Sequence, residues 1–499
     1  MAAELFDSDG ISLRWDTTLR YSTMFRVGAR DQLLVSNPNS DDGDRNFGTG
    51  LVSSRLDVFS QADLTYGDFG LRLSGAGWYD SVYAQRDAND SPTTFNPLSV
   101  PHDAFTHATR RLHGEDADLF DAYVHGSFSI DDMPVSFRLG RHTLLWGESL
   151  FFADNGIAAG QSPVDAIKAL GNPQAKTAEI LLPVTQASAV LLPRPDIAID
   201  LYYQFEWRKN RLPASGSYFS QADILDAGGE RLLLGNGSWL TRTDDLHPPG
   251  SGQFGAAVRF TEAAYNFGFY ALRFDSKNPE VYLRPDGSSG PGSVGDYQLV
   301  YPEDIELYGA SFSSYLGDDN VAGEISFRHN MPLLSIAATV PAGVIADADR
   351  HPLYAVGDTM HAQVSSVSVF SASMFWDAAD LTTELAASDL LGISRNRSAF
   401  DPTRGNFALS IEAAFEPRYF EVLPNLDIGV PIGVEYGLAG DSGINPRQSA
   451  NAGDIEMGLE ATFRTVWEAR FSYTHFLGSP AQQSLADRDF VSLSVQRTF

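Results

Sequence analysis

The sequence predicts an all-β fold, a transmembrane antiparallel β-barrel of about 18 strands with long extracellular loops and a partly helical segment in the lumen. Three observations support this: side chains alternate between apolar and polar in many segments, short and long connectors alternate, and the last ten residues form one more alternating stretch. Sixteen strands also fit the pattern, because strand boundaries are the least certain part of such a prediction. We expect residues 1–499 to form a single barrel domain.

The chain ends on FVSLSVQRTF, residues 490–499. Val491, Leu493, Val495 and Phe499 share one parity, and polar residues occupy the other. A side-chain period of two indicates a β-strand with one apolar and one polar face. A closed barrel, whose last strand pairs with the first and turns its apolar side to lipid, explains why a chain of this size ends in such a strand.

The same alternation recurs along the chain, in segments 11–21, 197–208, 425–436 and 454–464. In the first of these, Ile11, Leu13, Trp15, Leu19 and Tyr21 oppose a polar series that includes Arg14, Asp16 and Arg20. Segments of about ten residues with this pattern are typical of membrane barrels, although each one alone is a weak signal.

Connector lengths provide a second test. Short connectors lie at 66–70, 129–134, 193–196, 261–264, 317–320 and 377–380, and long segments lie at 29–52, 84–116, 148–183, 209–251, 277–302 and 330–356. Short periplasmic turns and long external loops are the usual asymmetry of these barrels. We therefore predict 18 strands near residues 11–27, 53–66, 69–83, 117–130, 133–146, 184–193, 196–208, 253–262, 264–276, 303–316, 320–329, 358–376, 380–390, 405–416, 425–438, 453–464, 467–477 and 488–499.

A soluble β-sandwich or propeller is the competing architecture. Its apolar faces would enter a core and need no aromatic belt, and a propeller would show a repeat of 40–50 residues, which is absent. Aromatic residues instead gather at the predicted strand ends, as expected at membrane interfaces. These residues are Tyr203, Trp207, Tyr436, Phe463, Trp467, Tyr473 and Phe499.

Composition excludes several classes of function. The 499 residues carry a net charge of −29 with only four lysines, which argues against a nucleic-acid partner. Cysteine is absent, so disulfides and thiolate metal sites are excluded. No run of about 18 apolar residues is present. Residues 1–10 lack the basic and apolar regions of a signal peptide, so we expect a mature sequence with an added Met1 if the protein is exported.

Charges of both signs occupy the predicted lumen face. Most of them are expected to pair across neighbouring strands, and a few are expected to form a constriction that filters solutes. The candidates for these roles are Arg14, Asp16, Arg20, Asp200, Glu206, Arg208, Glu324, Arg328, Glu460, Arg464, Glu468 and Arg470.

Two long loops, 217–240 and 332–345, contain more apolar residues than external loops normally expose. They are candidates to capture an apolar ligand, and the alternative is that they pack on one another or on another protein. The candidate capture residues are Phe219, Leu233, Leu333, Leu334 and Ile336.

No motif indicates catalysis, a metal or a cofactor: HExxH and GxSxG are absent, and the ten histidines are scattered. The acidic loop SDDGDRN, residues 40–46, has oxygen ligands suited to Ca²⁺ but lacks the twelve-residue EF-hand spacing. We predict a solvated loop there. A hydrolase at the barrel rim has no specific support.

The stretches 138–157 and 162–192 resemble the domain of unknown function 1302 family. The resemblance is carried by Gly140, Arg141, Trp146, Gly147, Glu148, Phe151, Phe152, Pro163, Val164, Asp165, Leu182, Pro183 and Val184, and segment 416–436 adds to it. It implies a proteobacterial outer-membrane barrel associated with catabolism of hydrophobic compounds such as steroids, or with lipid exporters of the resistance-nodulation-division type. His142 and Thr143 depart from the family pattern.

Segment 148–183 is the candidate plug or gating insert. Its SPVDAIKAL stretch predicts a short helix with Ser162 as N-cap, Pro163 at the first position and Gly171 just beyond its end. We expect the segment to enter the lumen, because the apolar pair Phe151 and Phe152 precedes the helix. The plug and pathway candidates are Arg138, Arg141, Trp146, Glu148, Phe151, Phe152, Asp165 and Lys168.

The resulting expectation is a non-catalytic outer-membrane channel for hydrophobic or amphiphilic molecules, lipid-like or steroid-like. A general or cation-favouring diffusion porin and a barrel scaffold for a lipid exporter are the alternatives. The expected partners are outer-membrane lipids, a hydrophobic small molecule and periplasmic or exporter proteins.

Overall fold

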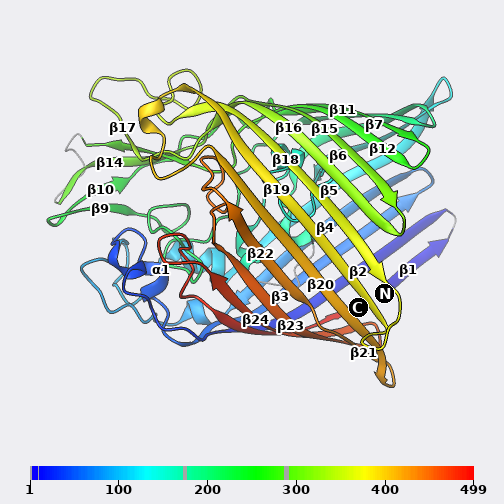
Figure 1. Ribbon diagram of the computed structural model, residues 1–499, viewed down its shortest axis with the longest axis horizontal. Helices are drawn as coiled ribbons and strands as arrows, with labels where there is room; N and C mark the ends of the chain where they lie inside the picture. The colour runs from blue at the N-terminus through cyan, green and yellow to red at the C-terminus, as the bar shows by residue number, and fades with distance from the viewer. Residues whose placement is uncertain (1–2, 9, 172–176, 286–291) are drawn as a thin grey trace.

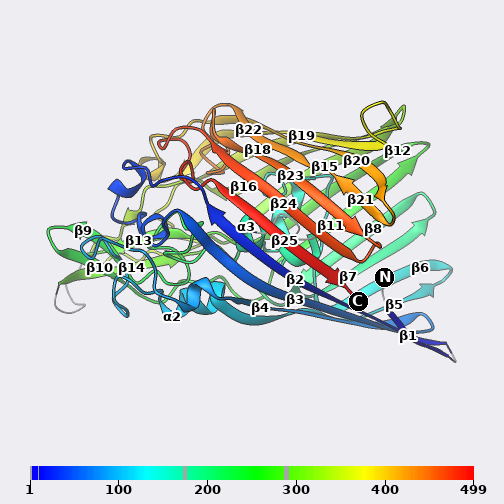
Figure 2. The same ribbon diagram turned by 90° about the horizontal axis from the view of Figure 1, so that it is seen from below.

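The computed structural model describes residues 3–8, 10–171, 177–285 and 292–499. Inclined strands form the wall of a barrel, and both chain ends lie toward the end of the barrel opposite the long loops (Figures 1 and 2). The strands form one sheet of twenty and a second sheet of five.

The large sheet closes into an antiparallel ring of 18 strands, as the sequence predicted. The ring has two strands fewer than the sheet for two reasons. β1 only forms a short hairpin with the start of β2. β21 and β22 follow one another in a single position between β20 and β23, so they count as one wall strand. β25 pairs with β2 from Thr18 opposite Thr498 to Arg26 opposite Phe490, which closes the ring. The C-terminal stretch therefore has the role that its alternation predicted.

The wall strands lie close to the predicted ranges. In chain order, the strands of the large sheet are β1 Ala3–Ser8, β2 Ile11–Arg26, β3 Gly50–Tyr66, β4 Phe69–Asp80, β5 Glu115–Ile130, β6 Met133–His142, β7 Val184–Arg194, β8 Ile197–Gln204, β11 Phe254–Glu262, β12 Tyr265–Phe274, β15 Ile305–Leu316, β16 Asp319–Pro332, β18 Val356–Phe370, β19 Ala378–Arg395, β20 Phe407–Leu423, β21 Leu426–Gly429, β22 Ile432–Ala439, β23 Gly453–Phe463, β24 Trp467–Leu477 and β25 Phe490–Thr498.

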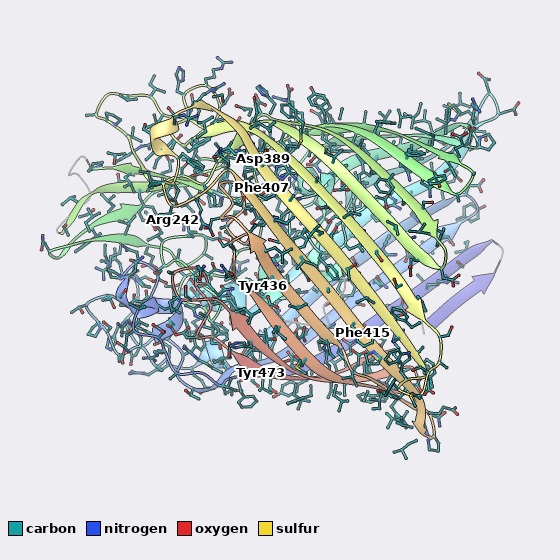
Figure 3. The ribbon with its side chains drawn as sticks, in the orientation of Figure 1. Arg242, Asp389, Phe407, Phe415, Tyr436 and Tyr473 are labelled. Carbon is teal, nitrogen blue, oxygen red and sulfur yellow. The ribbon has the colours of Figure 1, made fainter. Side chains whose placement is uncertain are left out.

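The outer face of the wall is apolar and the inner face is polar. On β2, Trp15 is 50% exposed on the outside, whereas Arg20, on the opposite parity, is 1% exposed inside. Phe407 and Tyr473, labelled in Figure 3, belong to the same exposed apolar surface. Such a surface is stable only in contact with lipid. Exposed aromatic residues near the short turns are Trp15, Tyr66, Phe69, Phe128, Tyr265, Tyr315, Phe463, Trp467 and Phe499.

Trp207 is an exception to the predicted aromatic belts. β8 ends at Gln204, so the alternation of the strand does not reach this residue. Its ring packs on His247 and Tyr301, with ring centroids 5.4 and 4.9 Å apart, inside a cluster of loop residues. The prediction that Trp207 belongs to a membrane belt was wrong, because the chain had already left the wall.

The short turns explain how neighbouring strands are joined. Ile130 pairs with Met133, and the two residues between them, Asp131 and Asp132, have φ of 47° and 68°. Positive φ at both central positions is the geometry of a type I′ turn, which matches the twist of antiparallel strands and favours Asp and Asn.

Three long loops fold into the second sheet, at the end of the barrel opposite the short turns (Figure 1). Its core contains Tyr282, Tyr297, Leu299 and Tyr301. These segments were expected to be long external loops, because each strand is too short for a clear alternation. The strands are β17 Ala338–Thr339, β13 Glu280–Arg284, β14 Ser293–Val300, β10 Ser238–Arg242 and β9 Arg231–Gly235, in sheet order.

Helices are short and lie between strands. Within the described parts of the chain, no helix is long and apolar enough to cross a membrane. The α-helices are α1 Asp42–Arg45, α2 His107–Thr109, α3 Ala166–Gly171 and α4 Thr177–Ile180, and the 3-10 or π turns are η1 Leu34–Ser36, η2 Val82–Ala84, η3 Arg110–Gly114, η4 Ile157–Gly160 and η5 Arg397–Ala399.

A second group of loops, 27–49, 81–114 and 205–230, meets beside the ends of β2, β4 and β25. We call these three loops the lid. They share an aromatic core, in which the ring of Phe47 lies 5.4 Å from that of Tyr218 and Phe219 lies 5.6 Å from Phe490. The lid is thus folded against the wall.

Candidate functional site

Residues 143–183, which we call the lumen insert, connect two neighbouring wall strands, β6 and β7. The insert nevertheless reaches side chains of β16, β18 and β19. Around the ring, the shorter path from β6 to these strands passes five other strands: β7, β8, β11, β12 and β15. The path in the other direction passes more strands. The insert therefore crosses the lumen to the far wall. Residues 172–176 lie outside the described part of the insert.

Two wall carboxylates hold the first half of the insert by its backbone. Glu384 on β19 accepts hydrogen bonds from the amides of Leu150, Phe151 and Phe152, at 3.1, 2.6 and 2.8 Å. Carboxylate bonds to backbone N–H groups are among the stronger hydrogen bonds in proteins, so this anchor fixes three consecutive peptide units.

Glu324 on β16 is the second carboxylate anchor. It accepts from the amides of Glu148 and Ile157, at 2.6 and 2.8 Å, and from the side-chain amide of Gln363 at 3.0 Å. Since the two amides are nine residues apart, Glu324 closes segment 148–157 into a loop. Side chains of the wall thereby define the shape of a segment that contains almost no regular structure.

The carbonyl groups of the same loop face an arginine. The Arg328 guanidinium donates to the carbonyl oxygens of Asp154, Asn155 and Gly156, at 3.2, 2.7 and 2.9 Å. Asn155 also shares a hydrogen bond of 2.8 Å with His361 on β18. In this loop, backbone amides donate to the two wall carboxylates and backbone carbonyls accept from one guanidinium, so these buried groups have partners.

The second half of the insert begins at a helix that starts later than predicted. Asp165, rather than Ser162, caps α3, because its carboxylate accepts from the Lys168 amide at 3.1 Å. The Ser162 hydroxyl instead bonds with the backbone of Leu144 at 3.1 and 3.0 Å. The prediction of the N-cap was therefore wrong by three residues: both types can cap a helix, and only the fold decides between them.

This half is fixed to the wall beside β2. Arg20 bonds through two nitrogens to the carboxylate of Glu179, both at 3.1 Å, and the two side chains are almost fully buried. Arg211 bonds to Asp165 at 2.6 Å. Burial lowers the pKa of Lys168, although Asp57 and Glu179 act in the opposite direction.

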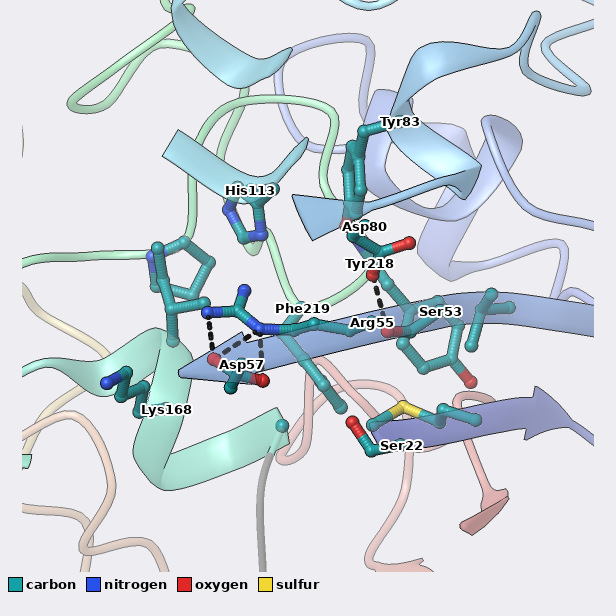
Figure 4. Close-up of a pocket in the computed structure, with 15 residues that line it drawn as sticks. Ser22, Ser53, Arg55, Asp57, Asp80, Tyr83, His113, Lys168, Tyr218 and Phe219 are labelled. Carbon is teal, nitrogen blue, oxygen red and sulfur yellow. Dashed lines mark hydrogen bonds and ion pairs between the residues drawn. The ribbon is translucent and has the colours of Figure 1, made fainter. Parts of the chain in front are cut away.

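A cavity of about 50 Å³ lies between α3, the wall and the lid (Figure 4). Arg55 and Asp57 are bonded to each other along one side, and Lys168 and His113 also line the cavity. Burial lowers the pKa of His113 to about 3, with Arg55 and Arg211 adding to the effect, so the ring is neutral. Ligand pockets usually measure about 300–1,000 Å³, so this cavity is too small for a drug-sized organic ligand.

The predicted plug and pathway residues fall into two groups. Trp146, Glu148, Phe151, Phe152, Asp165 and Lys168 lie in the insert, and the Trp146 ring packs on Tyr202 of the inner wall at 5.0 Å. Arg138 faces the lumen beside Tyr123, 5.8 Å from its ring. Arg141 is paired in the outward-facing register with Thr185 and bonds to Glu206 at 2.9 Å, so the fold does not bring it to the lumen.

The predicted capture residues are distributed over several environments. Phe219 and Leu333 are buried in separate loop cores, Leu233 and Leu334 are half-buried, and Ile336 is exposed. For Phe219 and Leu333, burial favours the alternative that the loops pack on one another. A role of these residues in capture stays a prediction.

Some of the inward charges pair across neighbouring strands, as expected. Arg259 bonds to Asp200 at 2.7 Å, and Arg470 bonds to Glu456 at 2.9 Å. Arg20, Glu324 and Arg328 were predicted among these charges, but their partners in the insert could not be predicted from the alternation. It missed Glu384 and Asn155 entirely; the alternation of β19 was the only signal that placed Glu384 on the lumen face.

The fold and the site define a class of protein: a closed membrane barrel whose lumen is crossed by a side-chain-anchored insert. The whole sequence, residues 1–499, matches the family described as "Protein of unknown function (DUF1302)", and the chain belongs to that family. No curated protein matches the sequence.

Among solved structures, the chain is similar to Acinetobacter baumannii OccAB3, at 10% identity over 98% of this chain and 99% of that one, with a TM-score of 0.46. It is also similar to Pseudomonas aeruginosa OpdK with vanillate, at 10% identity, 98% of both chains and a TM-score of 0.43. A third is the Salmonella typhi OmpF complex with daunomycin, at 8% identity, 100% of both chains and a TM-score of 0.39.

Proposed function

We propose that this protein is a non-catalytic outer-membrane channel that moves hydrophobic or amphiphilic molecules past the lumen insert. The observation that carries the proposal is the anchored insert itself. A closed ring with a polar lumen is suited to solute passage, and a fixed segment across that lumen narrows the path.

The surface of the insert supports an amphiphilic rather than a purely polar solute. Leu145 and Leu150 are 50% and 46% exposed although the backbone around them is held in place. Apolar side chains kept in contact with water at a constriction offer a surface for the apolar part of a passing molecule. The paired charges of the wall would face its polar part.

Transport and conductance measurements on the purified full chain test the proposal. In proteoliposomes, we expect uptake of a fluorescent cholate, an amphiphilic steroid, and little swelling in isotonic arabinose. In planar bilayers, we expect low steady conductance. A large, steady, cation-selective conductance with rapid arabinose entry would instead establish the diffusion porin, the alternative that the excess of acidic residues favours.

A barrel that serves as scaffold for an exporter would show neither uptake of the cholate probe nor a large, steady conductance. In that case, purification from native membranes under mild conditions should recover a stoichiometric complex with exporter or periplasmic proteins. Recovery of single chains that take up the cholate probe would exclude that alternative.

A further inference from the structure

The lid contains three acidic side chains that no part of the proposed function uses. Asp41 and Asp42 lie at the start of α1, and Asp223 lies in the loop that follows β8. All three are 0% exposed. One carboxylate oxygen from each residue lies within 4.8 Å of those of the other two. The sequence analysis predicted a solvated loop at residues 40–46, and that prediction was wrong, because the lid folds over it.

The hydrogen bonds around the three carboxylates are incomplete. Asp42 accepts from the Asn89 side chain at 3.1 Å and from the Asn96 amide at 2.9 Å. Asp223 Oδ2 accepts from the Asp42 amide at 3.0 Å, and Asp41 Oδ2 accepts from Arg45 at 2.5 Å. Asp41 Oδ1 and Asp223 Oδ1 are buried without any hydrogen-bond partner.

Two orphaned carboxylate oxygens in one buried cluster point to a ligand. Leaving a buried acceptor unsatisfied costs about 1–3 kcal/mol, and more when the group is charged. A cation between the carboxylates would supply the missing contacts to both oxygens.

The charge balance leads to the same conclusion. Among the residues that the structure describes, Arg45 is the one guanidinium bonded to the cluster, and it is shared with Asp90 at 3.0 Å. Arg231 donates to the Phe95 carbonyl, and Arg488 donates to the carbonyls of Tyr218 and Ser220, each at 2.6 Å.

We propose that Asp41, Asp42 and Asp223 bind a divalent cation of the Ca²⁺ type, which joins two loops of the lid. Carboxylate and carbonyl oxygens are the ligands that Ca²⁺ prefers, and its flexible coordination suits a site built from loops. Mg²⁺ requires a tighter octahedral arrangement and loses its water reluctantly, so it should bind less well.

The position of the site explains what the cation does. Asp41 and Asp42 belong to the loop after β2, whereas Asp223 belongs to the loop after β8. The same two loops are joined by a bond from the Asp223 amide to the Asn39 carbonyl at 2.8 Å, and by one from Asn46 to the Gly216 carbonyl at 2.8 Å. The cation therefore links loops from distant wall strands over the barrel end.

Calcium titration of the full chain in detergent tests the proposal. After EDTA treatment and dialysis into metal-free buffer, we expect calorimetry and elemental analysis to find one Ca²⁺ bound per chain. Asp42→Asn and Asp223→Asn should each weaken binding by about tenfold or more, since both remove a charged ligand. Asp132→Asn, in an exposed turn, is the matched control and should bind as the wild type does. Binding of Mg²⁺ should be weaker than that of Ca²⁺.

Limited proteolysis of the wild type provides a readout that needs no variant. EDTA should expose the lid loops to cleavage, and Ca²⁺ should restore their protection. The absence of bound Ca²⁺, or unchanged binding in Asp223→Asn, would overturn the site. Either result would leave the transport proposal intact, because the conductance and uptake measurements do not depend on this cluster.

Discussion

The lumen insert and the lid both bury carboxylates, but they satisfy them in different ways. Glu384 receives three backbone amides and Glu324 receives two amides and a side-chain amide. Asp41 and Asp223 each keep one oxygen without a partner. Both oxygens of each wall carboxylate that holds the insert therefore have a donor, whereas two lid carboxylates keep one oxygen that a cation or a proton would satisfy. Burial of acidic groups therefore does not by itself identify a metal site; the hydrogen-bond partners of each carboxylate oxygen do.

The largest effect is expected from Glu384→Ala. Each amide that loses its acceptor costs about 1–3 kcal/mol, and three are affected, so segment 148–157 should leave the far wall. Hydrogen exchange of its amides should become fast, and bilayer conductance should rise clearly. Glu456→Ala, a lumen carboxylate that does not contact the insert, is the control. Unchanged exchange in Glu384→Ala would show that the anchor is not what holds the loop.

Arg328→Met tests the carbonyl side of the same loop. Three carbonyl groups lose their donor, and we expect a loss of about 2–4 kcal/mol in the local stability of residues 154–156. Because the Glu324 and Glu384 anchors remain, the conductance should fluctuate rather than rise steadily. Single-channel recording distinguishes the two patterns, and a steady open state would contradict the separate roles assigned to the anchors.

The pH dependence of the lid sharpens the contrast with the insert. Burial raises the pKa of Asp223 to about 7 and also raises that of Asp42, so the folded lid without cation holds protons that the unfolded chain releases. The contribution of these two groups to the stability of the lid is therefore fully present below about pH 4, and that of Asp223 is lost as the pH rises through about 7. Proteolysis at pH 5 and pH 8, with EDTA, should show more cleavage at pH 8. Ca²⁺ should remove that difference, and a lid equally resistant at both pH values in EDTA would contradict the prediction.

The smallest effect is expected from Arg470→Met. Its partners Glu456 and Glu460 are partly exposed to the lumen, and such ion pairs contribute only about 0–1 kcal/mol. Thermal unfolding and conductance should stay near wild-type values. A marked loss of stability would mean that the wall depends on its charge ladder, not only on strand pairing and lipid contact.

The wall was predictable because each strand carries its own signal. A period of two, with one face toward lipid, specifies strand and orientation from neighbouring residues alone, and connector lengths give the order. Segment 490–499 indicated ring closure for the same reason. The pattern failed at Trp207, where the alternation of residues continued beyond the end of β8.

The insert and the lid depended on residues far apart in the chain. A sequence shows that Glu384 is acidic and faces inward, but it does not show that the amides of 150–152, more than two hundred residues earlier, come to meet it. The burial of Asp41 and Asp42 likewise required a loop 181 residues away from Asp42. Alternation and solvent preference are local properties and were decided by the sequence. The satisfaction of buried charges is a property of three-dimensional contacts, and only the tertiary structure decided it.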